Sequence, residues 1–189
     1  MKSEITYFEN LRENNTPETF RLVKERLEGS GIQKIVLAST TGKCAEYAMD
    51  FFQGTGVQLV VVPHQFDFSS PTNRFPESLT VRLRKNGHQV HFGTMLFHTD
   101  KLFGSSVPTV IADFLRCFSQ GVKVCYEIVL MAADAGLLQS GEKVIAVAGT
   151  GLGADTALVM QAASTHHFKN LRVNEIICKP LYEYIEQNR

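Results

Sequence analysis

The sequence lacks an excess of charge of either sign, since 19 Lys and Arg side chains balance 19 Asp and Glu in 189 residues. A neutral chain has no global field that would draw it to nucleic acid or to an anionic membrane. It also lacks an apolar run of the roughly 18 residues that a membrane-spanning helix needs. Its first seven residues do not have the pattern of a signal peptide. We therefore expect neither nucleic acid nor a membrane as a partner.

Cysteine is scarce and is not spaced for a metal. The four cysteines, Cys44, Cys117, Cys125 and Cys178, form no C-x-x-C pair. Reduced thiols in a cytoplasmic protein, with no metal site, are the expectation. Internal repeats and low-complexity segments are absent too, so nothing marks a domain boundary. Residues 1–189 are expected to form a single α/β domain, a length that allows a sizeable core.

What the chain does contain is an alternation of short apolar runs with helical patterns. Strands that alternate with helices favour a three-layer α/β/α fold around a mostly parallel sheet. The expected strands cover residues 32–38, 57–63, 89–95, 144–148 and 171–179. The expected helices run from residue 16 to the glycines at 29–31 and over residues 45–53, 77–86, 107–120, 122–137 and 154–163.

The stretch from Lys143 to Thr156 reads K-V-I-A-V-A-G-T-G-L-G-A-D-T. A buried strand, a glycine-rich turn and the expected helix would bring unpaired N–H groups and a helix dipole to one spot, which predicts an anion site. The alternative is a turn needed only for tight packing of a strand against a helix. The candidate binding residues here are Gly149, Thr150, Gly151, Gly153, Ala154 and Asp155.

These glycines also match the dinucleotide fingerprint G-x-G-x-x-[GA] at Gly149, Gly151 and Ala154. That fingerprint opens a nucleotide-binding fold, whereas only one further strand-like run, residues 171–179, follows this one. We therefore do not expect an NAD domain downstream of Gly149.

A second strand-to-helix junction lies earlier, at residues 39–44. It is not a Walker A loop, because the upstream glycine is absent and Cys44 stands where Ser or Thr would hold Mg²⁺. Its hydroxyls, backbone N–H groups and one ammonium suit a phosphate, although the hydroxyls alone could instead cap the next helix. Both junctions would open at the carboxyl edge of a parallel sheet, where ligands bind. This favours a phosphorylated ligand held by Ser39, Thr40, Thr41, Gly42 and Lys43.

Three further observations leave alternatives open. His64 follows a strand and begins a long connection, residues 64–76, so it is either a ligand contact or an ordinary surface histidine. Phe66, Phe97 and His98 could flank a flat ligand or simply close a core. In the helix over residues 122–137, a stripe of charged residues is expected to face solvent, the alternative being an acidic stripe in the cleft. Its members are Lys123, Glu127 and Asp134.

With both loops considered, the chain resembles the C-terminal α/β domain of pyruvate kinase over about residues 16–159. In that domain a helix and a strand lead into a hydroxyl-rich S-T-S-G-T-T-like loop, to which residues 39–44 are similar except for Lys43 and Cys44. The later G-x-x-x-x-G-D segment, strand and G-S-G turn are similar to residues 136–142 followed by residues 144–151. The catalytic barrel, at least ~200 residues by itself, has no counterpart here, so the resemblance implies no pyruvate kinase activity.

The helical segment over residues 107–137 and the residues after 168 resemble the standalone "pyruvate kinase alpha/beta domain" proteins. That resemblance implies a bound phosphorylated cofactor, FMN, whose phosphate would lie at residues 39–43. Asp155 would accept from its ribityl hydroxyls or would simply be an acid in the first turn of the expected helix. The kinase domain itself binds a sugar bisphosphate through these loops. A homo-oligomer is compatible with either reading.

Three alternatives to a simple FMN-binding protein stay open. One is a sugar-phosphate or nucleotide sensor without chemistry, and another is a small flavin-dependent oxidoreductase. The third is a thiol enzyme that uses Cys44, whose place at a helix N-terminus would lower its pKa. No base lies near Cys44 in the sequence, which favours a structural role for it.

Overall fold

The computed structural model describes residues 3–69, 71–100 and 104–182. In chain order its elements are β1 (Thr6–Phe8), α1 (Thr16–Leu27), β2 (Lys34–Ala38), α2 (Lys43–Phe51), β3 (Gln58–Val62), α3 (Glu77–Lys85), β4 (Gln89–Val90), the 3-10 helix η1 (Leu96–His98), α5 (Val107–Arg116), α6 (Gln120–Asp134), β5 (Lys143–Ala148), β6 (Thr156–Gln161), the 3-10 helix η2 (Thr165–Asn170) and β7 (Arg172–Pro180). No helix in these ranges has the length and apolar character needed to cross a membrane.

The seven strands form one mixed sheet in the order β1-β7-β6-β5-β2-β3-β4. The pairs β1–β7, β5–β2, β2–β3 and β3–β4 are parallel. Only the two pairs that involve β6 are antiparallel. The expected mostly parallel α/β sheet is confirmed. Because the parallel strands point the same way, the loops after β2, β3 and β5 meet at one edge.

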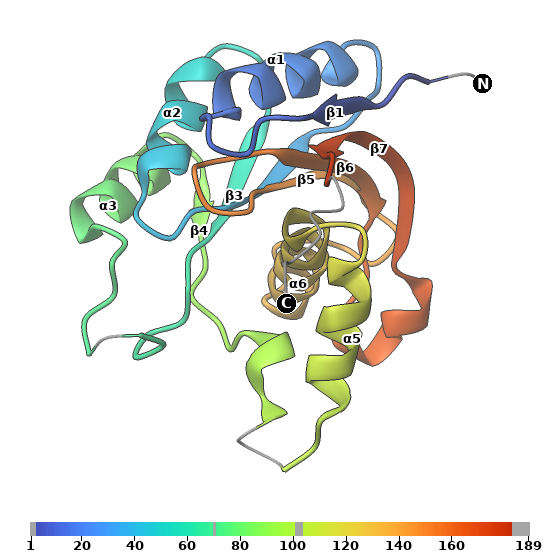
Figure 1. Cartoon of the computed structure of the whole chain (residues 1–189). Coiled ribbons are helices and arrows are strands. Elements are labelled where there is room, and N and C mark those ends of the chain that lie inside the picture. The colour runs from blue at the N-terminus through green and yellow to red at the C-terminus, as the bar shows by residue number, and fades with distance from the viewer. Residues whose placement is uncertain (1–2, 70, 101–103, 183–189) are drawn as a thin grey trace.

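Helices cover both faces of this sheet (Figure 1). Helices α1, α2 and α3 lie on one face, and α5 and α6 lie on the other. Side chains of β2 alternate accordingly, since Ile35 and Leu37 pack in the core under α1–α3 while Val36 packs in the core under α6. Strands with both faces covered are apolar without interruption. The expected three layers are confirmed.

The helix expected over residues 154–163 is wrong, because this segment is the antiparallel strand β6. Its composition, rich in Ala, Leu and Met, suits a helix, but propensity is a weak prior that tertiary context overrides. Five of the six residues in β6 are buried, between β5 and β7 and under helices on both faces. A short apolar run cannot be assigned to a helix or a buried strand by periodicity alone.

Two boundaries and one strand also differ from the expectation. The strand expected over residues 89–95 is only Gln89–Val90. The break between α5 and α6 lies at residues 117–119 rather than at Gly121, because the Ser119 hydroxyl accepts a hydrogen bond from the Val122 amide and caps α6. Gly121 lies inside α6, where a Cβ would come within 2.1 Å of the Thr156 hydroxyl. The three-residue β1, which pairs with β7, was not expected.

Candidate ligand-binding cleft

A cleft of about 960 Å³ opens at the carboxyl ends of β2, β3 and β5. This volume is at the upper end of the 300–1,000 Å³ that is typical of small-molecule sites. Six segments of the chain form its walls: the loop after β1 with the start of α1, the β2–α2 junction, the loop after β3, the segment around η1, one face of α6, and the β5–β6 turn. Both loops that the sequence singled out therefore border the same cleft.

The β2–α2 junction supplies hydroxyls and one ammonium to the cleft. Thr40, Thr41 and Lys43 line the cleft, and the amides of the first turn of α2 begin there. Ser39 also lines it, but its hydroxyl accepts a hydrogen bond from the Ala45 amide at 3.2 Å. The helix-capping alternative therefore holds for Ser39, while Thr40 contacts His64 in the cleft and Thr41 and Lys43 remain available to a ligand.

Gly42 shapes this junction without lining the cleft. It has φ of +87° and is the N-cap of α2. A Cβ at this position would lie 2.6 Å from Leu79 Cδ2 and 3.1 Å from Pro76 Cδ. The glycine is required by the left-handed backbone and by contact with the start of α3, rather than by the approach of a ligand.

The β5–β6 turn does not provide a helix N-terminus, so the helix that was expected to complete an anion site there is absent from this turn. Gly149 and Gly153 close the turn against each other, since a Cβ on Gly149 would lie 1.7 Å from the Gly153 carbonyl oxygen. Gly153 has φ of +101° and packs on Thr16. The tight-packing alternative explains these two glycines. The turn still forms one wall of the cleft, with Thr150 and Gly151 exposed.

Ala154 and Asp155 are buried and do not line the cleft. The Ala154 amide donates to the Thr16 hydroxyl at 2.8 Å. One Asp155 carboxylate oxygen accepts from the Thr150 amide at 2.8 Å and the other accepts from the Thr156 hydroxyl at 2.7 Å. Because both oxygens of Asp155 are engaged within the turn, this carboxylate organises the turn and is not free to accept from ribityl hydroxyls.

Cations without an acidic partner surround the cleft. Arg12, Lys43 and Arg74 line it and are exposed. None of the three makes an ion pair with another residue in the parts of the chain that the structure describes. Basic side chains that converge on one hollow raise the local concentration of anions. The charge at the rim of the cleft therefore suits an anionic ligand, although the chain as a whole is neutral.

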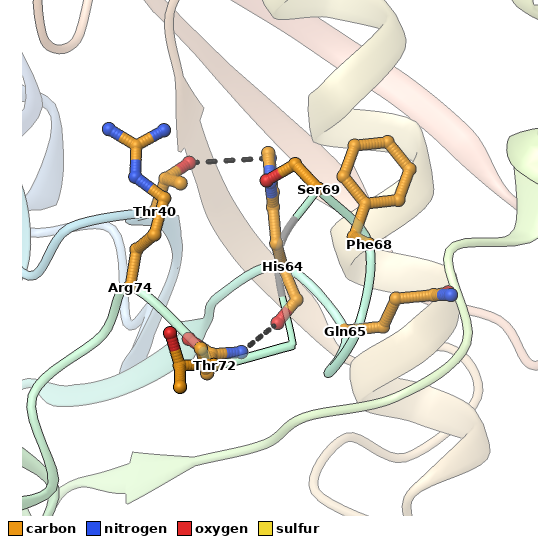
Figure 2. A pocket seen from close by; sticks show the side chains of 8 residues that line it. Thr40, His64, Gln65, Phe68, Ser69, Thr72 and Arg74 are labelled. Atoms are coloured by element: carbon orange, nitrogen blue, oxygen red, sulfur yellow. Dashed lines mark hydrogen bonds between the residues drawn. The ribbon is translucent and has the colours of Figure 1, made fainter.

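His64 lies in the cleft as expected and belongs to a row of aromatic rings. Its Nε2 is 3.3 Å from the Thr40 hydroxyl, and its ring packs edge-on against Phe68 at 5.0 Å between centroids. Phe68 in turn packs against His98 at 5.1 Å. Figure 2 shows Thr40 and Arg74 on one side of the His64 ring and Phe68 on the other. Burial, and then the charge of nearby His98, lower the pKa of His64, so its ring is neutral at pH 7.

The other two aromatic candidates lie outside the cleft lining. Phe66 is exposed and packs against Phe92, while Phe97 is buried in the core under α6. His98 and Phe68 are thus the side chains that accompany His64 at this end of the cleft.

The expectation that the charged stripe of α6 faces solvent is wrong for Lys123 and Glu127. Lys123 and Glu127 do form an i,i+4 ion pair at 2.5 Å, but their side chains are only 1% and 3% exposed. Both line the cleft. Asp134 lies apart from them at the exposed end of α6, where it accepts from the Thr165 amide. The stripe therefore contributes one buried ion pair to the site.

Cys44 is poorly suited to act as a nucleophile. It lies in the first turn of α2, and its sulfur is 3.8 Å from the Thr16 hydroxyl. Burial raises the pKa of this thiol and outweighs the hydrogen bond from Thr16. This is opposite to the activation that a helix N-terminus would provide, and it supports the structural role favoured from the sequence.

Sequence reasoning missed several residues of the cleft. Arg12 and Asn14 follow β1, a strand too short to show a pattern. Arg74 lies in the long connection after β3, whose length did point to a function. Tyr47 lies within α2 and Gln120 is the first residue of α6, and neither belongs to a sequence motif that would have indicated a binding site.

No family model matches this chain. Among solved structures, it is similar to two chains of pyruvate kinase from Cryptosporidium parvum, one of them in complex with ADP. Both are pyruvate kinases. Each match has 14% sequence identity and a TM-score of 0.43 and covers 80% of this chain. This chain spans only 23% and 24% of the length of the two kinase chains.

Proposed function

We propose that this protein binds a phosphorylated small molecule, FMN in the first place, in the cleft at the carboxyl edge of its sheet. The observation that carries the proposal is the set of unpaired cations, Arg12, Lys43 and Arg74, around a cleft of about 960 Å³. The hydroxyls of Thr40 and Thr41 and the first turn of α2 lie on the same wall. Such donors bind phosphate oxygens with charge-assisted hydrogen bonds.

The residues present fit FMN at both ends. The phosphate would lie at the junction of residues 39–44, next to Lys43. The ring would lie among His64, Phe68 and His98, and apolar side chains of α6 line the same cleft, namely Val124, Ile128 and Met131. When bound, a flavin would supply redox chemistry. Asp155 takes no part in this arrangement, because its oxygens are used within the β5–β6 turn.

A sugar phosphate is the second candidate, and one observation favours it. The end of the cleft that would receive the flavin ring also holds the ion pair of Lys123 and Glu127, with Gln120 and His98 beside it. These polar groups suit the hydroxyl and carbonyl groups of a sugar phosphate better than they suit the apolar edge of a flavin.

A titration separates the two candidates. The purified protein is mixed with FMN, riboflavin, FAD and a sugar bisphosphate in turn, and binding is followed by flavin fluorescence and by calorimetry. We expect saturable quenching of FMN fluorescence and much weaker binding of riboflavin, because riboflavin lacks the phosphate. Binding of the sugar bisphosphate without FMN would replace the first candidate with the second. If no phosphorylated compound binds, the proposed function is wrong.

A further inference from the structure

The side chain of Glu127 is held by three donors at one end of the cleft. Its Oε1 accepts from the Phe97 amide at 2.8 Å and lies 3.4 Å from Nδ1 of His98. Its Oε2 accepts from the ammonium of Lys123 at 2.5 Å. The Glu127 side chain is only 3% exposed, so this carboxylate is removed from bulk water and depends on these three groups for its interactions. A binding cleft for an anion does not by itself require a buried carboxylate.

Glu127 is ionised in this environment. Burial acts to raise its pKa, but the hydrogen bond from His98, the charge of Lys123 and the Phe97 amide outweigh burial, and the pKa of Glu127 lies below its ordinary value. Burial lowers the pKa of Lys123, while Glu127 opposes that shift. A carboxylate with a lowered pKa, in contact with an amine at 2.5 Å, is an ion pair at neutral pH.

A carboxylate at Nδ1 selects the tautomer of His98. Glu127 can only accept at this position, so in the neutral ring Nδ1 is the nitrogen that carries the proton and Nε2 is the one with the lone pair. Phe68 packs edge-on against the ring at 5.1 Å and limits its rotation. The His98 side chain keeps 31% of its surface exposed, and the residue lines the cleft. The imidazole is thus oriented by a buried group and open to a ligand.

The charged and titratable groups around His98 come from two parts of the chain. Glu127 and Lys123 belong to α6, and His64 belongs to the loop after β3. Arg74, in the same loop, acts on His64 through its charge. Among the residues that the structure describes, Glu127 is the carboxylate in contact with His98.

We propose that His98 is a general base, positioned by Glu127, that removes a proton from a carbon next to a carbonyl group in a phosphorylated substrate. The C–H bond breaks, the proton moves to Nε2 of His98, and the electron pair forms the C=C bond of an enolate. The carbonyl oxygen takes the negative charge of the enolate. Return of a proton from Nε2 to the same carbon re-forms the C–H bond and the carbonyl group, and completes the step without a further reactant.

This inference rests on the proposed function in one respect, since the cleft must hold a phosphorylated ligand, but it does not require flavin. The cations at Arg12 and Lys43 would hold the phosphate, and His98 lies at the end of the cleft formed by α6. His98 is the catalytic residue of this site, and Glu127 is a positioning residue that acts through it.

The test is exchange of carbon-bound hydrogen with solvent. Dihydroxyacetone phosphate is incubated with the protein in D₂O, and the loss of its C–H signals is followed by proton NMR. Glycerol 3-phosphate, which lacks the carbonyl, is the ligand control. His166→Gln is the matched control variant, because His166 is exposed and does not line the cleft. Binding of both ligands is measured separately by calorimetry.

We expect saturable exchange of dihydroxyacetone phosphate and none of glycerol 3-phosphate. General acid–base catalysis contributes about 10²- to 10⁴-fold, so His98→Gln should slow exchange at saturating ligand by at least about 100-fold while changing affinity only a few-fold. His166→Gln should exchange as the parent does. In the parent, the ¹⁵N shifts of His98 should show the tautomer protonated at Nδ1, and Glu127→Gln should shift the tautomer equilibrium.

Each result decides between this inference and the proposed function. Glu127→Gln leaves Lys123 buried without its counter-ion and is destabilised, so the doubly neutral variant Lys123→Met/Glu127→Gln provides a second test and should also lose exchange. If dihydroxyacetone phosphate binds but no exchange occurs, or if His98→Gln exchanges normally, the inference is wrong and the proposed function stands. If FMN binds and dihydroxyacetone phosphate does not, the substrate class is wrong. If no phosphorylated ligand binds, both fall together.

Discussion

Replacing Glu127 with glutamine should destabilise the protein strongly through a single buried charge. Glutamine keeps the shape and an oxygen that can still accept from the Phe97 amide, but it leaves the Lys123 ammonium without its counter-ion. The two side chains are 1% and 3% exposed and 2.5 Å apart. Removing one partner of such a pair costs about 3–5 kcal/mol. The glutamine oxygen retains a weak contact with the ammonium, so we expect about 3 kcal/mol.

Urea denaturation at pH 7 measures this loss directly. With a slope of about 3 kcal/mol/M, the midpoint should fall by about 1 M, and the melting temperature should fall by about 6–12 °C. Lys123→Met should also destabilise, because it leaves the carboxylate with two donors. The double variant Lys123→Met/Glu127→Gln should recover much of the loss, since no charge remains buried. Single variants within 1 kcal/mol of the parent would refute the description of a buried ion pair.

The same pair predicts a pH dependence. The pKa of Glu127 is lower in the folded protein than its ordinary value of 4.5. Its contribution to stability is therefore complete above that value and is lost as the pH falls through the lower folded pKa. The parent should lose stability in this acid range more steeply than the double variant does. Parallel curves for the two proteins would contradict this assignment.

Three further predictions concern the β2–α2 junction. Lys43→Ala should weaken binding of FMN about three- to tenfold and leave the affinity for riboflavin unchanged, because Lys43 is exposed and its charge-assisted hydrogen bond to the phosphate is screened. Equal losses of affinity for both ligands in calorimetry would place the lysine away from the phosphate. Gly42→Val should lower the free energy of unfolding by about 3 kcal/mol or more in urea denaturation, since φ is +87° and a Cβ would lie 2.6 Å from Leu79. A loss smaller than about 1 kcal/mol would contradict that geometry. Cys44→Ser should bind FMN within a few-fold of the parent, and loss of an activity with binding intact would restore the thiol hypothesis.

The layered fold was predictable because its signals are local and repeated. Apolar runs with β-branched residues predicted β2, β3 and β5, and Pro17 with Glu18 predicted the start of α1. Strand β6 was not predictable in this way. Its residues favour a helix locally, and only its place between two strands makes it extended.

The cleft was predictable in part for the same reason. Parallel strands bring their carboxyl ends to one edge, so two loops that are far apart in the sequence could be placed in one site. The conformation of the β5–β6 turn could not be predicted, because it depends on the misassigned strand. Lys123 and Glu127 have the spacing of a common surface pair, and their burial follows only from how α6 packs on the sheet.

The measurement that tests the central claim most directly is a comparison of FMN with riboflavin at two salt concentrations. If the unpaired cations around the cleft hold a phosphate, FMN should bind at least about tenfold more tightly than riboflavin, a difference of about 1.4 kcal/mol. That advantage should shrink as salt rises, because exposed charges are screened, and Arg12→Ala/Lys43→Ala should remove most of it. Equal affinities for FMN and riboflavin, unchanged by salt and by the double variant, would contradict the account.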